Sequence, residues 1–115
     1  MINLDAAQFS EKISDQKVVI LDVRTAAEFA EGHIPNAINI DIFSDYFTAD
    51  VSALDKSFEY AIYCRSGKRS VDAATAMDEI GFSTSNLTGG IISWAEANKE
   101  ITCELRWGST LQLVF

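Results

Sequence analysis

A nearly continuous apolar run, Val18 to Val23, constrains the fold of this chain more than any other stretch. Apart from Asp22, its residues are aliphatic on both faces, which is typical of a parallel strand buried in the middle of a sheet. A second apolar run, Phe58 to Tyr63, is followed by a helical pattern from about Arg69 to Ile80. Strands that alternate with helices predict an α/β fold, because neighbouring parallel strands need crossover connections.

The remaining segments extend this pattern to a central, mostly parallel sheet of about five short strands with helices on both faces. Residues 38–42 alternate apolar and polar side chains, which predicts a half-exposed strand near a sheet edge, and residues 83–87 predict a short last strand. Residues 43–56 predict a loop with one or two helical turns. Two capping boxes predict helix starts, at Asp5 with Gln8 and at Thr25 with Glu28.

The helix after Tyr63 carries an apolar stripe at spacing i, i+3, i+4 and i+7, which we expect to pack on the sheet: Ala73, Ala76, Met77 and Ile80. A chain of 115 residues fits one domain. We assign residues 1–101 to this domain and residues 102–115 to a C-terminal extension of unassigned role. The extension, which contains Cys103 and Trp107, either packs on the domain, pairs with another chain, or is a truncated or vector-derived end.

Charge and composition limit the partners of the chain. Its 9 Lys and Arg against 17 Asp and Glu give a net charge of −8, which argues against a nucleic acid or an anionic membrane as a partner. No apolar run approaches the ~20 residues that span a bilayer, and the first residues lack the features of a signal peptide, so we expect a cytoplasmic location. Two cysteines are too few for a zinc site or a disulfide framework, and we expect no metal or other cofactor.

Cys64 lies where the second apolar strand ends and a helix is about to begin. The first N–H groups of a helix lack partners and carry partial positive charge, so this position binds anions and stabilises a thiolate. The segment that follows contains Arg65, Lys68 and Arg69 and no acid, against the negative charge of the whole chain. This setting predicts a thiol pKa below the ordinary value of about 8.5. The alternative is that Cys64 is a small buried hydrophobic residue.

Four motifs occur in order between about residues 3 and 100. They are Val19-Ile20-Leu21-Asp22-Val23-Arg24; Glu28-Phe29 with Glu31-Gly32-His33-Ile34-Pro35-Asn36-Ala37; Tyr63-Cys64-Arg65-Ser66-Gly67-Lys68-Arg69-Ser70; and Leu87-Thr88-Gly89-Gly90 with Trp94. Together they resemble the rhodanese (sulfurtransferase) domain, whereas any one of them alone would be a weak signal. The resemblance implies a rhodanese-like fold, with Cys64 as the catalytic residue that carries sulfur as a persulfide.

The resemblance also implies a donor-binding loop after the cysteine, in which converging N–H groups and cationic side chains hold an anion. Its residues are Arg65, Ser66, Gly67, Lys68, Arg69 and Ser70. Asp22 and Arg24 would support the site from the end of the first buried strand. We expect Asp22 to pair with a loop arginine or a backbone donor, the alternative being a solvent-facing charge. His33 lies in the Gly-His-Ile-Pro turn of the family, where we expect it to hydrogen-bond locally.

The expected activity is a two-step sulfur transfer. The Cys64 thiolate takes the outer sulfur of an anionic donor such as thiosulfate, and a thiol, cyanide or a sulfur-carrier protein then accepts it. The charge of the loop by itself supports only a small anionic substrate. Two alternatives are a catalytically silent rhodanese-like binding or regulatory module, and a cysteine phosphatase or arsenate reductase. The phosphatase loop is Cys-x5-Arg, whereas here the position six after Cys64 is Ser70 and Arg69 falls one place early.

Overall fold

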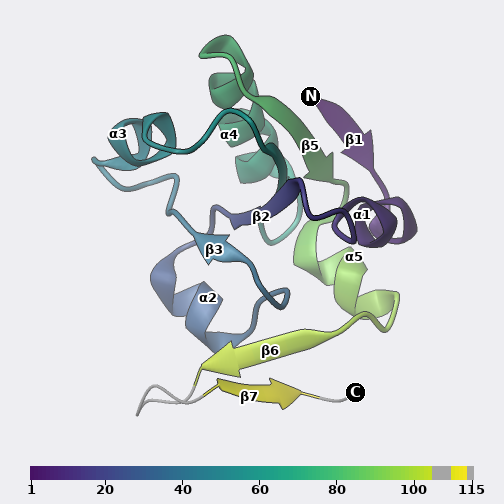
Figure 1. Ribbon diagram of the computed structural model, residues 1–115. Helices are drawn as coiled ribbons and strands as arrows, with labels where there is room; N and C mark the ends of the chain where they lie inside the picture. Colours follow the sequence, from purple (N-terminus) through teal and green to yellow (C-terminus); the bar gives the residue numbers. More distant parts are fainter. Residues whose placement is uncertain (105–109, 114–115) are drawn as a thin grey trace.

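The computed structural model describes residues 1–104 and 110–113. At its centre is a five-stranded sheet of order β1-β5-β4-β2-β3, in which every pairing is parallel (Figure 1). Its strands are β1 (Ile2–Leu4), β2 (Val18–Asp22), β3 (Ile38–Asn39), β4 (Glu59–Tyr63) and β5 (Ser83–Leu87). The α/β class and the parallel sheet predicted from the two apolar runs are therefore confirmed.

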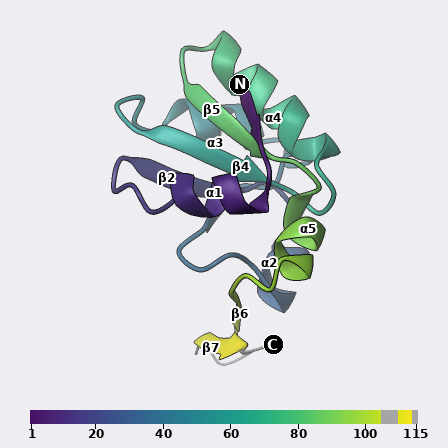
Figure 2. The same cartoon turned by 90° about the vertical axis from the view of Figure 1, so that its right-hand side faces the viewer.

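Helices cover both faces of the sheet, as Figures 1 and 2 show. On one face, α1 (Ala6–Lys12) and α5 (Gly90–Glu96) share a core cluster with the β4 residues Ala61 and Tyr63. On the other face, α3 (Phe47–Ser52) and α4 (Lys68–Glu79) share a second cluster with Ile62. Successive side chains of β4 thus alternate between two cores. The short helix α2 (Ala26–Glu31) lies apart from both, close to α5 at one end of the molecule.

Both predicted capping boxes are present. The Gln8 amide donates to Asp5 Oδ1 over 2.8 Å, and the Asp5 amide donates back to Gln8 Oε1 over 2.9 Å. The Glu28 amide donates to Thr25 Oγ1 over 3.2 Å, and the Thr25 amide donates to Glu28 Oε1 over 3.1 Å. These bonds satisfy donors that would otherwise be unpaired at the starts of α1 and α2, which is why both helices begin where the sequence indicated.

Two strands differ from the expectation. Strand β1 was not placed from the sequence; it is a short, largely exposed edge strand that pairs with β5 in the register Leu4↔Leu87. Strand β3 lies at the opposite edge, as predicted, but spans only Ile38–Asn39 instead of residues 38–42. Beyond it the chain still follows β2, because the Ile40 amide donates to the Asp22 carbonyl over 2.9 Å.

The predicted buried face of α4 is correct at Ala73 and Met77 and wrong at Ala76 and Ile80. The helix buries Ser70, Ala73, Ala74 and Met77, whereas Ala76 is exposed and Ile80 is 39% exposed. The buried set keeps the spacing i, i+3, i+4 and i+7, but it starts at a serine. Ser70 faces inward because its hydroxyl has partners beside Cys64. A search for apolar side chains at helical spacing could not include this serine.

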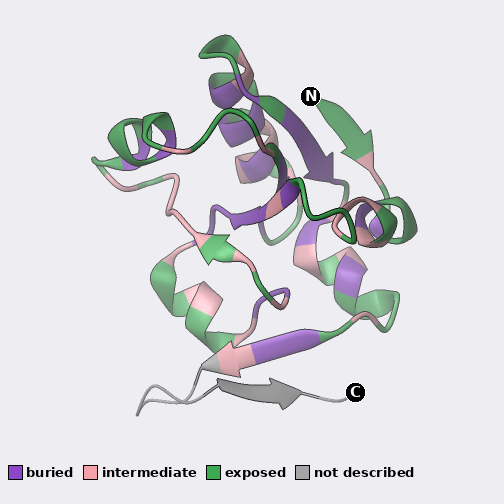
Figure 3. Cartoon of the chain, viewed as in Figure 1, coloured by how far each residue is buried: buried purple, intermediate pink, exposed green. Residues whose placement is uncertain are grey.

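Residues 101–104 form a strand that lies against the rest of the domain. Strand β6 (Ile101–Glu104) pairs antiparallel with β7 (Thr110–Leu113), and Thr102 also exchanges two backbone hydrogen bonds with His33, over 2.8 and 2.9 Å. Ile101 and Thr102 are buried, which Figure 3 shows as the purple part of β6. Trp107 lies outside the described residues. No helix among the described residues is long and apolar enough to cross a bilayer.

Candidate active site

Cys64 follows the last residue of β4, which lies in the middle of the sheet between β2 and β5. The loop after it leads into α4, with Gly67 at the N-cap in a left-handed conformation of φ 114°. In parallel sheets with crossover helices, binding sites form at this carboxyl edge of the strands. The topology thus brings the thiol to the place where the sequence analysis expected it, at the junction of a strand and a helix.

Hydrogen-bond donors of the loop converge on the sulfur. The Gly67 amide donates to Cys64 Sγ over 3.0 Å, and the Ser70 hydroxyl lies 3.3 Å from the same atom. Burial raises the pKa of Cys64, but hydrogen bonds from the Ser70 hydroxyl and from the amides of Ser70, Gly67 and Ser66 outweigh it. The pKa of the thiol therefore lies below its ordinary value, and the loop favours a thiolate.

The same residue is almost fully covered. Cys64 is 1% exposed and belongs to the core cluster that contains Leu21, Ile62 and Met77. The two alternatives drawn from the sequence are therefore not exclusive, since the thiol is buried and also ringed by donors. The loop residues Arg65 and Ser66 are exposed, whereas the strand below them is buried, so solvent lies on the loop side of the covered sulfur. A reacting molecule has to approach from there.

Asp22 is paired with Arg24 and not with a loop arginine. Its carboxylate accepts the Arg24 amide over 2.8 Å and the Arg24 guanidinium over 2.7–3.1 Å. Asp22 is 0% exposed, so a solvent-facing role is excluded. Burial by itself would lower the pKa of Arg24, but the hydrogen bonds and charge of Asp22 outweigh it and raise that pKa. Arg24 also donates to the Gly32 carbonyl over 2.6 Å, which joins the end of β2 to the turn after α2.

Tyr63, the residue before Cys64, is held by the same turn. Its hydroxyl oxygen accepts the Ile34 amide over 3.0 Å, and the Arg24 guanidinium lies 5.6 Å from the centre of its ring. Burial raises the pKa of Tyr63, and the nearby Asp22 raises it further, so the phenol stays protonated. His33 has the expected local bond, with Nδ1 2.8 Å from the Phe29 carbonyl oxygen. The contacts of Tyr63 hold in place the backbone that leads directly into Cys64.

The three loop cations differ in their surroundings. Arg69 forms a bidentate ion pair with Glu28. Its Nη1 donates to Oε1 over 2.8 Å, and its Nη2 donates to Oε2 over 2.9 Å. The hydrogen bonds of this pair, with those from Thr25, lower the pKa of Glu28 to about 2. Lys68 is 89% exposed and 3.9 Å from Asp72, while Arg65 is exposed and has no ion pair within residues 1–104. Only Arg65 and Lys68 thus present largely uncompensated charge to solvent.

Sequence reasoning missed two residues that shape the loop, Glu28 and Gly90. The start of α5 packs against the loop backbone, where the Ile91 amide donates to the Cys64 carbonyl over 2.9 Å and the Ile92 amide donates to the Arg65 carbonyl over 3.2 Å. Gly90 has φ +62°, and a Cβ atom on it would lie 2.3 Å from the Arg65 carbonyl oxygen. The Gly89-Gly90 pair was visible in the sequence, but only as a turn.

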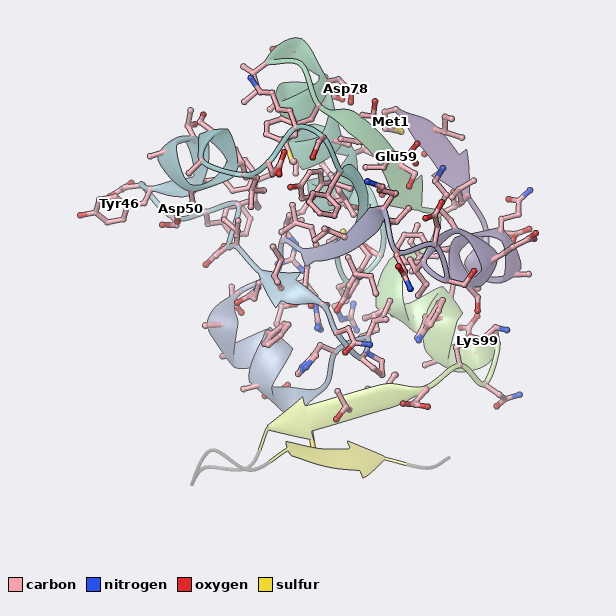
Figure 4. All side chains as sticks on the ribbon, viewed as in Figure 1. Met1, Tyr46, Asp50, Glu59, Asp78 and Lys99 are labelled. Carbon is pink, nitrogen blue, oxygen red and sulfur yellow. The ribbon has the colours of Figure 1, made fainter. Side chains whose placement is uncertain are left out.

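A groove of about 350 Å³ lies beside the loop, between α2 and α5. Polar side chains from Arg24, Glu28 and Arg65 line it together with the apolar Ile91 and Ile92. A second hollow lies at the opposite edge of the sheet near Met1, Glu59 and Asp78, which Figure 4 shows grouped by β1 and β5. Cys64 lines neither hollow, but the first groove adjoins the loop that follows Cys64 through Arg65.

The fold and the loop define a class of protein, an α/β domain that holds one cysteine at the start of a helix at the carboxyl edge of a parallel sheet. A sequence model described as a rhodanese-like domain matches residues 5–97. The chain therefore belongs to the rhodanese-like family.

Relatives of similar length support this assignment. A protein of Bacillus subtilis (strain 168) named "Putative sulfurtransferase YtwF" is 38% identical over 97 residues, which is 84% of this chain and 92% of that protein. A protein of Allochromatium vinosum named "Sulfurtransferase" is 37% identical over 98 residues, 83% of this chain and 90% of its own length. The crystal structure of a rhodanese-related protein from Thermoplasma volcanium matches with a TM-score of 0.82 and 31% identity, and covers 90% of this chain and all of that chain.

The same domain also matches parts of longer proteins. A tRNA uridine(34) hydroxylase of Erwinia tasmaniensis is 32% identical over 102 residues, which is 84% of this chain but 29% of that protein. Membership of the family is therefore compatible with more than one kind of whole protein.

Proposed function

We propose that this protein is a sulfurtransferase that moves a sulfane sulfur from an anionic donor, such as thiosulfate, to a thiol or cyanide acceptor through a persulfide on Cys64. The observation that carries the proposal is the convergence of the Gly67 amide and the Ser70 hydroxyl on the Cys64 sulfur. Donors in this arrangement stabilise a sulfur anion before and after it takes up a second sulfur. The sulfurtransferase names of the two relatives of similar length agree with it.

The first half-reaction loads the cysteine. The Cys64 thiolate attacks the outer sulfur of thiosulfate, a new S–S bond forms, the S–S bond of the donor breaks, and sulfite leaves with the electron pair. With one proton taken up, the products are Cys64–S–SH and sulfite, so charge and atoms balance without an oxidant. Because Cys64 is 1% exposed, this step requires the loop at the exposed residues Arg65 and Ser66 to move aside and admit the donor sulfur.

The second half-reaction unloads it. A thiolate acceptor attacks the outer sulfur of Cys64–S–SH, the Cys64 thiolate is the leaving group, and the acceptor becomes a persulfide. With cyanide the products are thiocyanate, a proton and the Cys64 thiolate. Two half-reactions that share one covalent intermediate predict ping-pong kinetics.

The phosphatase alternative fits the site less well. In a Cys-x5-Arg loop the arginine grips the phosphate oxygens, whereas Arg69 is turned to Glu28, which accepts hydrogen bonds from both of its terminal nitrogens. The donors that do reach the sulfur come from the loop and the first turn of α4, among them the Gly67 amide and the Ser70 hydroxyl. A cradle of this kind suits a single added sulfur atom better than a phosphate group.

Steady-state kinetics test the proposal against both alternatives. With thiosulfate and cyanide as varied substrates, thiocyanate formation should give parallel double-reciprocal lines, and Cys64→Ser should abolish it. An aryl phosphate should release no phosphate. Phosphate release that depends on Cys64, without thiocyanate formation, would favour the phosphatase. A protein that shows neither activity with any sulfane donor would fit the silent binding module.

A further inference from the structure

The positive charge around Cys64 is smaller than its three loop cations suggest. Arg69 is compensated by Glu28 through two hydrogen bonds, and Arg24 by Asp22 through a buried pair. Lys68 is 89% exposed, so solvent and salt weaken its field at the sulfur. Arg65 is the remaining cation that faces the groove beside the loop. An anion at the sulfur therefore meets a site of low net charge.

We propose that Glu28 is a specificity-determining residue: by neutralising Arg69 it makes the site favour persulfide donors, whose reacting sulfur group carries at most one negative charge, over dianionic thiosulfate. This inference rests on the proposed function and narrows its donor class. A second charge on the donor has little to attract it at the loop unless Arg69 is released. Releasing Arg69 means breaking two charge-assisted hydrogen bonds, which are the strong kind.

Glu28 is well placed to hold Arg69 permanently. Its Oε1 also accepts hydrogen bonds from the Thr25 amide and hydroxyl, both over 3.1 Å, so the carboxylate is fixed by the cap of α2. On its other side Arg69 lies 5.8 Å from the centre of the Phe43 ring. The pair is therefore held in place from both partners, and Glu28, with a pKa of about 2, keeps its charge at any physiological pH.

Arg69 is nevertheless close enough to influence the thiol. Arg69 directly precedes Ser70, whose hydroxyl lies 3.3 Å from the Cys64 sulfur. The hydrogen bonds with Glu28 raise the pKa of Arg69 against the effect of burial, and the charges of Glu28 and then of Cys64 raise it further. The guanidinium is thus close to the sulfur in the chain, while its hydrogen bonds point to α2. Removing the carboxylate alone would return one full positive charge to the neighbourhood of Cys64.

The groove beside the loop supplies room for the rest of such a donor. It contains Glu28 and Arg65 and has an apolar wall made by Ile91 and Ile92. An organic persulfide has a carbon skeleton that can cover this wall, whereas thiosulfate has only sulfur and oxygen atoms. Arg65 remains available for a carboxylate on the donor.

The loading step for a persulfide balances without a co-reactant. The Cys64 thiolate attacks the outer sulfur of R–S–SH, the new S–S bond forms, the old one breaks, and R–S⁻ leaves. The products are Cys64–S–SH and a thiolate, with one negative charge on each side and no change in the number of protons.

The test compares single-turnover loading of Cys64 by thiosulfate and by cysteine persulfide, measured as quenched intact mass. In the unaltered protein, we expect cysteine persulfide to load faster at equal concentration. Glu28→Gln should accelerate loading by thiosulfate about tenfold and leave persulfide loading within about twofold, since one unit of repulsive charge is removed near the site. Glutamine still accepts the Thr25 bonds of the capping box, so α2 should keep its start.

The matched control is Glu96→Gln, which removes the same charge from an exposed residue of α5 that does not line the groove and has no ion pair among the described residues. It should change neither rate by more than about twofold. Arg69→Gln should slow thiosulfate loading, and Glu28→Gln combined with Arg69→Gln should return it to the original rate.

Three results would overturn the inference. Equal or faster loading by thiosulfate in the unaltered protein would remove the preference. A ratio of the two rates that Glu28→Gln leaves unchanged, or that Glu96→Gln changes equally, would remove the role of Glu28; in either case the proposed function would stand. If neither donor adds sulfur to Cys64, the proposed function and this inference both fail.

Discussion

The hydroxyl of Ser70 lies 3.3 Å from the sulfur of Cys64, although six positions of loop and helix separate the two residues. Ser70 is 0% exposed and also lies 3.1 Å from the Gly67 carbonyl oxygen. The first turn of α4 therefore lies next to the thiol. A side chain of this helix contacts the sulfur of the cysteine at the end of β4. This contact is the reason why the buried face of α4 begins with a polar residue.

Ser70→Ala should raise the pKa of Cys64, because the hydrogen bond from the Ser70 hydroxyl is the largest of the effects that lower this pKa. The folded-state pKa lies below the ordinary value for a thiol, so the thiolate persists as the pH falls until that lower pKa is reached. The midpoint of the thiolate absorbance, titrated in a Cys103→Ser background, should move upward. The fold should change little, since alanine fills nearly the same volume. An unchanged midpoint would show that the amides alone stabilise the thiolate.

Arg69→Ala should cost about 1 kcal/mol of unfolding free energy at pH 7, as expected for a partly exposed ion pair. The pKa of Glu28 is lowered from 4.5 to about 2 in the folded protein, so this stabilisation is complete above pH 4.5 and is lost as the pH falls toward 2. Denaturant curves of the two proteins should converge over that range. Lys68→Ala is the control, because its 89% exposed side chain should contribute almost nothing. A gap that persists at pH 2 would mean that Arg69 acts by packing alone.

Gly90→Ala should destabilise the protein by at least about 2 kcal/mol and lower sulfur transfer per folded molecule. The added Cβ would lie 2.3 Å from the Arg65 carbonyl oxygen, so α5 or the loop must shift. Gly81→Ala separates clash from backbone strain: its φ is +99°, but a Cβ there would meet only the flexible Lys56 side chain, at 3.8 Å. Thermal unfolding should show the larger loss at Gly90. Equal losses would mean that the positive φ is the whole effect.

Tyr63→Phe should cost about 1–2 kcal/mol, because the buried Ile34 amide loses its acceptor. The ring stays, so no cavity forms in the core. Tyr46→Phe removes the same hydroxyl from a residue that is 72% exposed and should be nearly neutral. Urea unfolding of the two variants gives the comparison. Equal stabilities would indicate that water replaces the tyrosine oxygen.

The fold could be predicted from the sequence wherever a pattern of neighbouring residues specifies the structure. The apolar run of β2 and the capping box at Thr25 each specify a structure within a few residues, and both were placed correctly. Strand β1 was missed because it has only three residues and its register depends on β5, more than eighty positions away. The position of the thiol could be predicted for the same reason, because the strand, the cysteine and the helix follow one another in the sequence.

The electrostatic arrangement could not be predicted, because ion pairing depends on tertiary contacts. Arg69 and Glu28 are 41 positions apart, and the sequence shows only that both are charged. The sequence analysis expected Asp22 to pair with a loop arginine or a backbone donor, and the Arg24 amide confirms the second alternative. It did not predict the guanidinium partner, which belongs to the same Arg24, two residues away. Charges in a sequence can be counted, but which of them remain uncompensated is decided by the fold.

The most direct measurement of the central claim is the intact mass of the protein after incubation with a sulfane donor. We predict a gain of one sulfur atom, located by peptide mapping on Cys64, retained in Cys103→Ser, lost on addition of cyanide and absent in Cys64→Ser. A protein that gains no sulfur from either thiosulfate or cysteine persulfide, or that carries it on Cys103 instead, would contradict the account.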